Sequence, residues 1–232
     1  MSNAVDEGLI DYLGSFISDR RKGGIDQALD LRTRYLTVVL EDLFQPHNAS
    51  AVVRSCECFG VQDVYAVERA NKFDVNEDIA LGAGQWLDLK RCRLDQGESL
   101  QSLYGQLRDD GYRLVAATPA DGAVELDDVS VESRLAILMG TEEKGLSPES
   151  LELADEHVRI PMFGFTKSFN VSVSAALIMR ELTKRIRQSS VPWQLSPEEK
   201  LRLKLEWYRR SLRGSEQLES RYQKEQGAGI NG

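Results

Sequence analysis

The sequence predicts an α/β protein in which a mostly parallel sheet is flanked by helices. Apolar and β-branched runs alternate along the chain with segments of helical periodicity, which is typical of parallel sheets. One continuous apolar run, Leu135–Met139, stops at Gly140 and indicates a buried strand. After it, Ser168 and Asn170 begin a segment with apolar residues at helical spacing, which predicts a long helix that ends near Gln188.

The chain before the buried run alternates between predicted strands and helices. Residues 35–43 predict a central strand that ends before Pro46, and Asn48 is placed to cap the helix that follows, which extends to Gly60. Further strands are predicted at 64–67, 87–93 and 112–117, and a helix at 100–108. Such alternation joins neighbouring parallel strands through helices.

Both ends of the chain are predicted to be helical extensions. Residues 5–34 suggest one or two short helices interrupted at Gly23-Gly24, next to a basic cluster that is either an RNA-contacting arm or a surface turn. After a hinge at Pro192-Trp193, a last helix begins at Ser196, and residues 226–232 are expected to be disordered. We therefore divide the chain into an N-terminal extension (1–34), a central domain (35–190) and a C-terminal tail (191–232).

Composition and charge narrow the class of protein. The chain has 232 residues, no apolar run long enough for a membrane span and no signal-like leader, and its three cysteines suit a reducing cytoplasm. Cys56 and Cys58, with only His47 and His157 elsewhere, make a poor zinc set, so buried thiols on a helix and no metal are expected.

The net charge of -8 argues against a protein that coats nucleic acid indiscriminately. The charges are unevenly distributed, however, because residues 121–158 carry eleven acids and two bases whereas residues 180–213 carry ten bases and four acids. One basic face could therefore meet a phosphate backbone, or it could be an ordinary solvated helix face. Aromatic residues among the bases of the last helix allow stacking on RNA, or packing on the domain or on a second subunit.

Three segments together carry a more specific signal. They are HNASAVVR (47–54), GTEEKGLS (140–147) and IPMFGFTKSFNVSVSAA (160–176). In this order they resemble the three motifs of the SPOUT class of RNA methyltransferases and, more closely, the TrmH family, over Leu36 to Leu182. The resemblance implies a deep trefoil knot at about 135–185, a homodimer, and methylation of ribose 2′-hydroxyls in RNA from S-adenosylmethionine (AdoMet).

The resemblance also assigns candidate site residues. The positions that match the family's catalytic and substrate-placing set are Asn48, Arg54, Glu142, Ser168 and Asn170. The positions that match its adenosine-contacting loops are Ala117, Thr118, Gly140, Ile160, Met162 and Phe169. Candidate RNA contacts are the basic residues Arg20, Arg21, Lys22, His47, Lys184, Arg185, Arg187, Arg209 and Arg210. Each polar residue also has an ordinary alternative role, as a helix cap or a structural ion pair.

Arg54 is the candidate residue with the most direct role in methyl transfer. It lies among small and apolar residues of a predicted helix, so it must face a polar site or pair with a carboxylate. The family proposal makes this arginine the general base on the ribose hydroxyl. A guanidinium is effectively always charged, however, so a second interpretation gives Arg54 the stabilisation of a developing alkoxide.

The expected activity is 2′-O-methylation of guanosine 18 in the D-loop of tRNA. A guanosine of 23S ribosomal RNA is the alternative substrate, and a non-catalytic RNA-binding protein on the same fold is the alternative from another class. An oxidoreductase with a dinucleotide site is rejected because Gly82-Ala83-Gly84 lacks the third glycine of that fingerprint, where Leu87 stands.

Overall fold

The computed structural model describes residues 6–228, which form two compact units. One unit contains Thr33 to Trp193, and the other combines the chain up to Arg32 with the chain from Gln194 onward. The two ends of the sequence, which we expected to be separate extensions, therefore belong to one helical unit.

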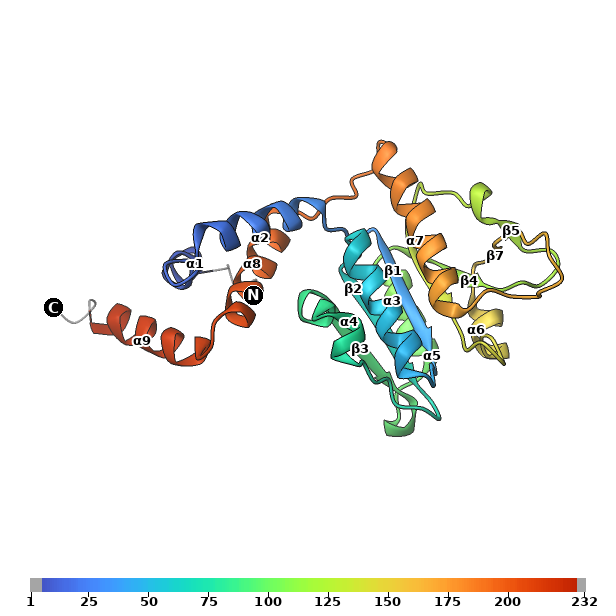
Figure 1. The fold of residues 1–232 in the computed structure, drawn as a ribbon, viewed down its shortest axis with the longest axis horizontal. Coiled ribbons are helices and arrows are strands. Elements are labelled where there is room, and N and C mark those ends of the chain that lie inside the picture. Colours follow the sequence, from blue (N-terminus) through green and yellow to red (C-terminus); the bar gives the residue numbers. More distant parts are fainter. Residues whose placement is uncertain (1–5, 229–232) are drawn as a thin grey trace. The chain divides into compact units, whose positions relative to one another are not determined.

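The larger unit is built on a seven-stranded sheet in which every pair of neighbours is parallel (Figure 1). The strands are β1 (Leu36–Glu41), β2 (Asp63–Glu68), β3 (Asp88–Arg93), β4 (Tyr112–Ala117), β5 (Val124–Glu125), β6 (Arg134–Met139) and β7 (Glu156–Arg159). Their order in the sheet is β3-β2-β1-β6-β4-β7-β5. All six residues of β1 are buried, which is why that segment is apolar without alternation.

Helices cover both faces of the sheet, as an α/β layer structure requires. Helices α3 (Pro46–Phe59) and α7 (Val171–Gln188) pack on one face, and α5 (Leu100–Asp109) and α6 (Pro148–Leu153) pack on the other. Two hydrophobic cores result, and consecutive residues of β1 such as Val38 and Val39 point into different ones. Short elements α4 (Glu77–Ala80), η1 (Ala83–Trp86), η2 (Leu94–Gln96) and η3 (Leu126–Asp128) lie in the connections.

The start of α3 differs from the sequence-based expectation, whereas the start of α7 agrees with it at Asn170. Helix α3 begins at Pro46, which occupies the first turn where a missing N–H costs nothing, so Asn48 lies inside the helix and is not its cap. Helix α7 is capped by Asn170, whose side-chain oxygen accepts from the Ser172 amide, and Ser168 precedes the helix. The side chain of Asn48 is thereby available for other contacts.

The second unit consists of α1 (Glu7–Gly14), α2 (Asp19–Leu31), α8 (Pro197–Ser211) and α9 (Ser215–Ala228). Gly23 and Gly24 lie within α2, so the predicted break there is wrong; the break falls between Ser15 and Ser18. Ser196 caps α8 in a reciprocal box with Glu199, as predicted. Residues 226–228, expected to be disordered, are helical in α9, while 229–232 lie outside the described residues.

The predicted fold class is confirmed, because the sheet is parallel and flanked by helices. The trefoil knot stays a prediction. Across residues 6–228, no helix has both the length and the apolar character needed to cross a bilayer.

Candidate active site at the edge of the sheet

Two neighbouring strands end at the point where the chain changes direction across the sheet. After β1 the chain passes through α3 to β2, and after β6 it passes through α6 to β7 on the opposite side of the sheet. Connections that leave adjacent parallel strands in opposite directions open a crevice at their carboxyl ends, where α/β proteins bind ligands. Asn48 follows β1 and Glu142 follows β6, so both side chains lie at this switch point.

Three of the predicted polar residues meet there. The side-chain amide of Asn48 donates to the Glu142 carboxylate and, at 2.8 Å, to Gln45. The amide of Asn170 donates to the Asn48 side-chain oxygen at 3.1 Å and lies 3.4 Å from the same Glu142 oxygen. Asn48 is buried whereas Glu142 and Asn170 are exposed, so the cluster forms the floor of an open site.

The N-terminus of α7 adds to the field around Glu142. Asn170 is the cap of this 18-residue helix, and its amide contacts the carboxylate. Because a helix N-terminus carries partial positive charge, an acidic group is favoured at this place. Glu142 is therefore held by two amide donors and by the helix, and its carboxylate can orient a hydroxyl or amine of a bound ligand.

The loop after β6 depends on Gly140. A Cβ at this position would overlap the carbonyl group of Gly145 and the backbone nitrogen of Leu146. The loop folds back on itself through two backbone hydrogen bonds between Thr141 and Gly145, and Gly145 has a φ of 66°. Glycine is required at both positions for the loop to place Glu142 next to Asn48.

Most of the predicted cofactor positions lie at the same edge. β4 and β7 are neighbours with Ala117 opposite Val158, and the Thr118 amide donates to the Val158 carbonyl. β6 pairs with β4 on the other side, with Leu138 opposite Ala116. The carboxyl ends of the three strands therefore bring together the set Ala117, Thr118, Gly140 and Ile160. Met162 and Phe169 belong to the loop between β7 and α7, and Met162 is half-buried.

Arg54 lies on α3 without an ion pair. Its side chain is exposed, and no partner for its guanidinium is found among residues 6–228. A position six residues after Asn48 lies about 9 Å further along the helix and about 120° around it. Arg54 is thus open to contact with a ligand, and it lies on a different side of α3 from Asn48.

Ser168 lies outside this cluster, and Gln45, which the sequence analysis did not single out, belongs to it. Ser168 is exposed and makes no hydrogen bond with the described part of the chain, so it does not join the cluster. Gln45, which precedes α3, accepts from Asn48 and was not predicted. Its only signal in the sequence is its position before a proline, which is too common to identify a site residue.

The predicted RNA-contacting residues divide into two groups. Some are held by the protein itself: Arg185 donates to the carbonyls of Leu126 and Val129, and Arg187 donates to Phe59 and lies over the Trp193 ring. Lys22 pairs with Asp19, and Arg209 pairs with Glu206 and Glu219. The exposed residues of the set are Arg20, Arg21, His47, Lys184 and Arg210.

Burial of the aromatic residues on α8 bears on the same question. Trp207 and Tyr208 are almost completely buried within the helical unit, and Arg32 lies over the Trp207 ring at 5.2 Å. Their ring faces are therefore used in packing. Burial raises the pKa of the Tyr208 hydroxyl, so this group stays neutral. Stacking of RNA bases on these two side chains, one of the alternatives above, is not available in this arrangement.

The cysteines are three free thiols in different surroundings. Cys56 is buried on α3 as expected, but Cys58 on the same helix is exposed, and Cys92 is buried in β3. Burial, reinforced by the charge of Glu98, raises the pKa of Cys92 to about 11. Between residues 6 and 228 no group of three His, Cys, Asp or Glu side chains is arranged to hold a metal ion.

Comparison with known proteins places this site in a family. The model of the SpoU rRNA Methylase family matches residues 35–180. A tRNA (guanosine(18)-2′-O)-methyltransferase of Borreliella burgdorferi is 40% identical over 211 residues, which cover 91% of this chain and 94% of that protein. The enzyme of the same name from Escherichia coli K12 is 35% identical over 170 residues, 73% of this chain and 72% of that protein.

A solved structure agrees with these relatives. The A. aeolicus TrmH/SpoU tRNA modifying enzyme superimposes with a TM-score of 0.74 at 28% identity, and the match covers 84% of this chain and 98% of that chain. The resemblance seen in the three motifs is thereby confirmed. This chain belongs to the SpoU rRNA Methylase family.

Proposed function

We propose that this chain transfers the methyl group of AdoMet to the 2′-hydroxyl of guanosine 18 in tRNA. The observation that carries the proposal is the meeting of Asn48, Glu142 and Asn170, one from each family motif, at the switch point of the sheet. The relatives of 40% and 35% identity are named for that reaction and match most of the chain. A protein of this kind acts where tRNA is processed, in the cytoplasm.

The edge formed by β4, β6 and β7 suits AdoMet. Ala117, Ile160 and Met162 are half-buried apolar residues, and Gly140 lets the backbone of the loop after β6 fold back closely on itself beside them. Such surfaces favour a flat heterocycle held by backbone contacts. When bound, AdoMet supplies an already activated methyl group, so the protein has to bind, orient and stabilise charge without a metal.

The remaining residues act on the ribose. Asn48 and Asn170 hold Glu142 in one orientation, and Glu142 can in turn accept a hydrogen bond from the nucleotide that presents its 2′-oxygen. In the transfer, the 2′-oxygen would bond to the methyl carbon as the carbon–sulfur bond breaks, S-adenosylhomocysteine would leave, and the hydroxyl proton would pass to solvent. The guanidinium of Arg54 would stabilise the negative charge that develops on the 2′-oxygen. We also assign Ser168, which is exposed before α7 and matches the family's motif, to contact with the same nucleotide.

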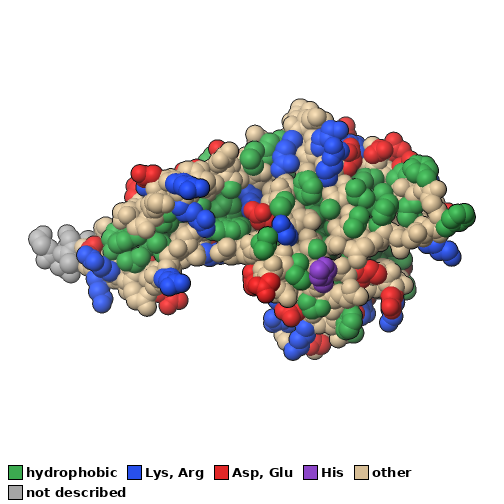
Figure 2. All heavy atoms as spheres, viewed as in Figure 1, with side chains coloured by type: hydrophobic (Ala, Val, Ile, Leu, Met, Phe, Trp, Pro, Cys, Tyr) green, Lys and Arg blue, Asp and Glu red, His purple; other side chains and the backbone are tan. Residues whose placement is uncertain are grey.

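A homodimer is part of the proposal. Large apolar side chains are exposed on α7 and on the loop before it, namely Phe163, Phe165, Phe169, Val173 and Leu177. Figure 2 shows hydrophobic side chains gathered over this region. Several large apolar side chains exposed on one helix and its preceding loop favour a subunit interface. Because Arg54 is exposed on a different side of α3 from Asn48, we assign it to the site of the second subunit.

Subunit mixing tests that assignment. Arg54→Ala and Ser168→Ala are each expected to be inactive as homodimers. If Arg54 serves the partner's site, a mixed dimer has one intact site, and an equal mixture recovers about a quarter of wild-type activity by random pairing. No recovery after demonstrated subunit exchange would place Arg54 and Ser168 in the site of the same chain.

The reaction itself is tested with labelled AdoMet and unmodified tRNA transcript, followed by mapping of the 2′-O-methyl group. Label at guanosine 18 is expected, and a transcript with inosine at that position is the matched substrate control for base recognition. Label only in 23S ribosomal RNA fragments would replace tRNA by the alternative substrate. AdoMet binding with no label in either RNA would identify a non-catalytic RNA-binding protein.

A further inference from the structure

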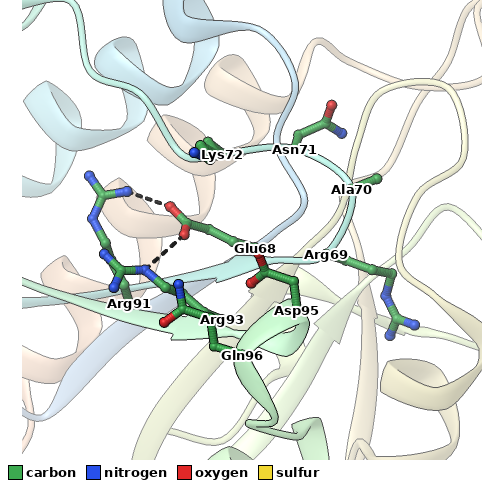
Figure 3. A pocket seen from close by; sticks show the side chains of 9 residues that line it. All are labelled: Glu68, Arg69, Ala70, Asn71, Lys72, Arg91, Arg93, Asp95 and Gln96. Carbon is green, nitrogen blue, oxygen red and sulfur yellow. Dashed lines mark hydrogen bonds and ion pairs between the residues drawn. The ribbon is translucent and has the colours of Figure 1, made fainter.

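A cavity lies at the same edge of the sheet, at the carboxyl ends of β2 and β3 (Figure 3). Its volume is about 390 Å³. It is lined by Glu68, Arg69, Ala70, Asn71, Lys72, Arg91, Arg93, Asp95 and Gln96. Four cations and two carboxylates thus surround this cavity, although the chain as a whole has a net charge of -8. None of the residues proposed for AdoMet lines it.

The loop that forms one wall of this cavity is held rigidly. One carboxylate oxygen of Asp42 accepts from the backbone amides of Arg69, Ala70 and Asn71 at 3.2, 2.8 and 2.7 Å. Asp42 itself has a φ of 56°, an uncommon conformation for a residue with a side chain. Such strain is kept only where surrounding contacts enforce it, so the wall is preorganised in the absence of a ligand.

The charges of the cavity are only partly balanced. Arg91 and Arg93 share one carboxylate, Glu68, which also accepts from the Phe73 amide at 3.0 Å. Figure 3 shows both guanidiniums directed to Glu68, while Arg69 points away from it. The Arg69 guanidinium pairs with Glu149 at 3.2 Å. Burial opposes ionisation of Glu68, but the Phe73 amide and the two arginines outweigh it and lower its pKa. One negative charge, that of Glu68, is therefore paired with two positive charges, those of Arg91 and Arg93.

Lys72 is the cation without a counterion. It is exposed at the rim, and no ion pair or hydrogen bond of its ammonium group is found in the described chain. An ion pair that only held the loop at Phe73 to the sheet, a structural clamp, would need no more than Glu68 and Arg91. Arg91 also donates to the Phe73 carbonyl at 2.7 Å. Lys72 and a second guanidinium, that of Arg93, add positive charge that this clamp does not require. The surplus suits an anion that enters from solvent.

The position of the cavity indicates the source of that anion. In the sheet, β2 and β3 are the second and third strands from β6, which at the usual strand spacing places them about 10 and 14 Å from the Glu142 loop. An RNA strand with one ribose at the cluster extends its neighbouring phosphates over such distances. We infer that this cavity binds a backbone phosphate of the RNA beside the methylated nucleotide, an inference that rests on the proposed RNA substrate.

Binding of tRNA across a range of salt concentrations tests the inference. Lys72→Gln and Arg93→Gln each remove one positive charge and leave the Glu68–Arg91 pair in place. Loss of one phosphate contact is expected to raise the Kd for tRNA roughly five- to tenfold near 0.1 M salt and to reduce the slope of log K against log salt by about 1. Calorimetric AdoMet binding and the melting temperature show whether the fold is intact.

Two variants serve as controls. Lys72→Arg keeps the charge and is expected to bind tRNA like the wild type. Arg134→Gln removes a cation at the start of β6, on the opposite edge of the sheet, and is expected to leave the salt slope unchanged. Wild-type affinity and slope in both Lys72→Gln and Arg93→Gln would refute the inference.

Binding of inorganic pyrophosphate tests whether the cavity is a site for a small free anion and not for an RNA phosphate. Pyrophosphate that binds in a Lys72-dependent way, with tRNA binding indifferent to Lys72, would overturn the assignment to RNA. Loss of tRNA affinity in Lys72→Gln with no methylation by the wild type would refute the proposed reaction and support the cavity as a phosphate site. Methylation of guanosine 18 by the wild type, with a tRNA affinity that does not depend on Lys72, would support the proposed reaction and refute the cavity as a phosphate site.

Discussion

The side-chain amide of Asn170 donates a 3.1 Å hydrogen bond to the side-chain oxygen of Asn48, a residue 122 positions earlier in the chain. The same Asn48 side chain donates to Glu142, so this bond connects the helix that follows β1 with the loop that follows β6. Because Asn48 is buried, removal of either partner would leave a buried polar group of its side chain without that hydrogen bond, which costs free energy. The cluster is therefore structural as well as chemical.

A double-mutant cycle on Asn48→Ala and Asn170→Ala measures this coupling. We expect an interaction free energy of about 1 kcal/mol in urea unfolding, because each single change already removes the shared bond. Asn48→Ala combined with Ser99→Ala, which removes the cap of α5 on the other face of the sheet, is the matched control and should be additive. Additivity of the asparagine pair would show that the bond contributes nothing in solution.

Removal of Arg54 is expected to reduce turnover and leave AdoMet binding nearly unchanged. Loss of one preorganised charge at a developing oxyanion costs about 100- to 1,000-fold in kcat. Since Arg54 has no protein partner among residues 6–228, Arg54→Ala should melt at the wild-type temperature. Single-turnover kinetics and calorimetry measure the two effects.

The matched control for Arg54 is Cys58→Ala, one turn further along α3 and also exposed, for which we expect wild-type turnover. Arg54→Lys should stay impaired because an ammonium lacks the planar fork of donors. Near-normal turnover of Arg54→Ala would remove the arginine from the mechanism.

Gly140→Ala is expected to abolish AdoMet binding. The added methyl would overlap the backbone of Gly145 and Leu146, so the loop must move and take Glu142 with it. Gly105→Ala in α5 is the control: a Cβ there meets no atom within 4 Å, and alanine should stabilise the helix by about 0.5 to 1 kcal/mol. Calorimetric titration with AdoMet and thermal melting distinguish the two; normal binding by Gly140→Ala would mean that the loop is not part of the cofactor site.

The Glu68 carboxylate predicts a pH dependence of stability. Its pKa is lowered in the folded chain by the Phe73 amide and the two arginines, against the effect of burial. A lowered pKa means that Glu68 stabilises the fold above its unfolded pKa of about 4.3 and that this stabilisation is lost as the pH falls through the folded value.

Glu68→Gln should therefore cost about 1 to 2 kcal/mol at pH 7, a modest value because both guanidiniums are partly exposed to water. The difference in unfolding free energy from the wild type should shrink as the pH falls below the unfolded pKa and through the lowered folded pKa, where the wild-type carboxylate is protonated as well. Urea unfolding at pH 7, 5 and 3.5 measures it. A difference that is constant with pH would show that the charge of Glu68 is not involved.

Several local features could be predicted from the sequence and several could not. Helix α8 was placed correctly because Ser196, Pro197 and Glu199 act through neighbouring residues. Gly23 and Gly24 were taken as a break, yet burial of Ile25 and Leu29 in α2 outweighs their poor helix propensity. Helix α9 was missed because weak patterning gives no local signal, and contacts of Tyr222 with Tyr12 and Asp6 join it to α1.

The candidate site shows the same division. Asn48 was expected to cap its helix, but Pro46 begins α3 two residues earlier and leaves the Asn48 side chain to reach Glu142. The motifs identified the site residues without showing which of them touch. Lys72, Arg91 and Arg93 carry no motif at all, and only the sheet brings their positions to one cavity.

What the sequence determined by itself is therefore the set of local structures: buried strands, glycine-dependent loops, helix starts, and motifs that name the family. These features depend on interactions within a few residues, which a linear pattern records. Only the tertiary structure decided that Asn48, Glu142 and Asn170 form one cluster, that Arg54 is left without a protein partner among residues 6–228, and that Trp207 is buried. The cluster follows from the order of strands in the sheet, and the burial of Trp207 follows from packing within the helical unit. Both bring together residues more than a hundred positions apart and leave no periodic trace along the chain.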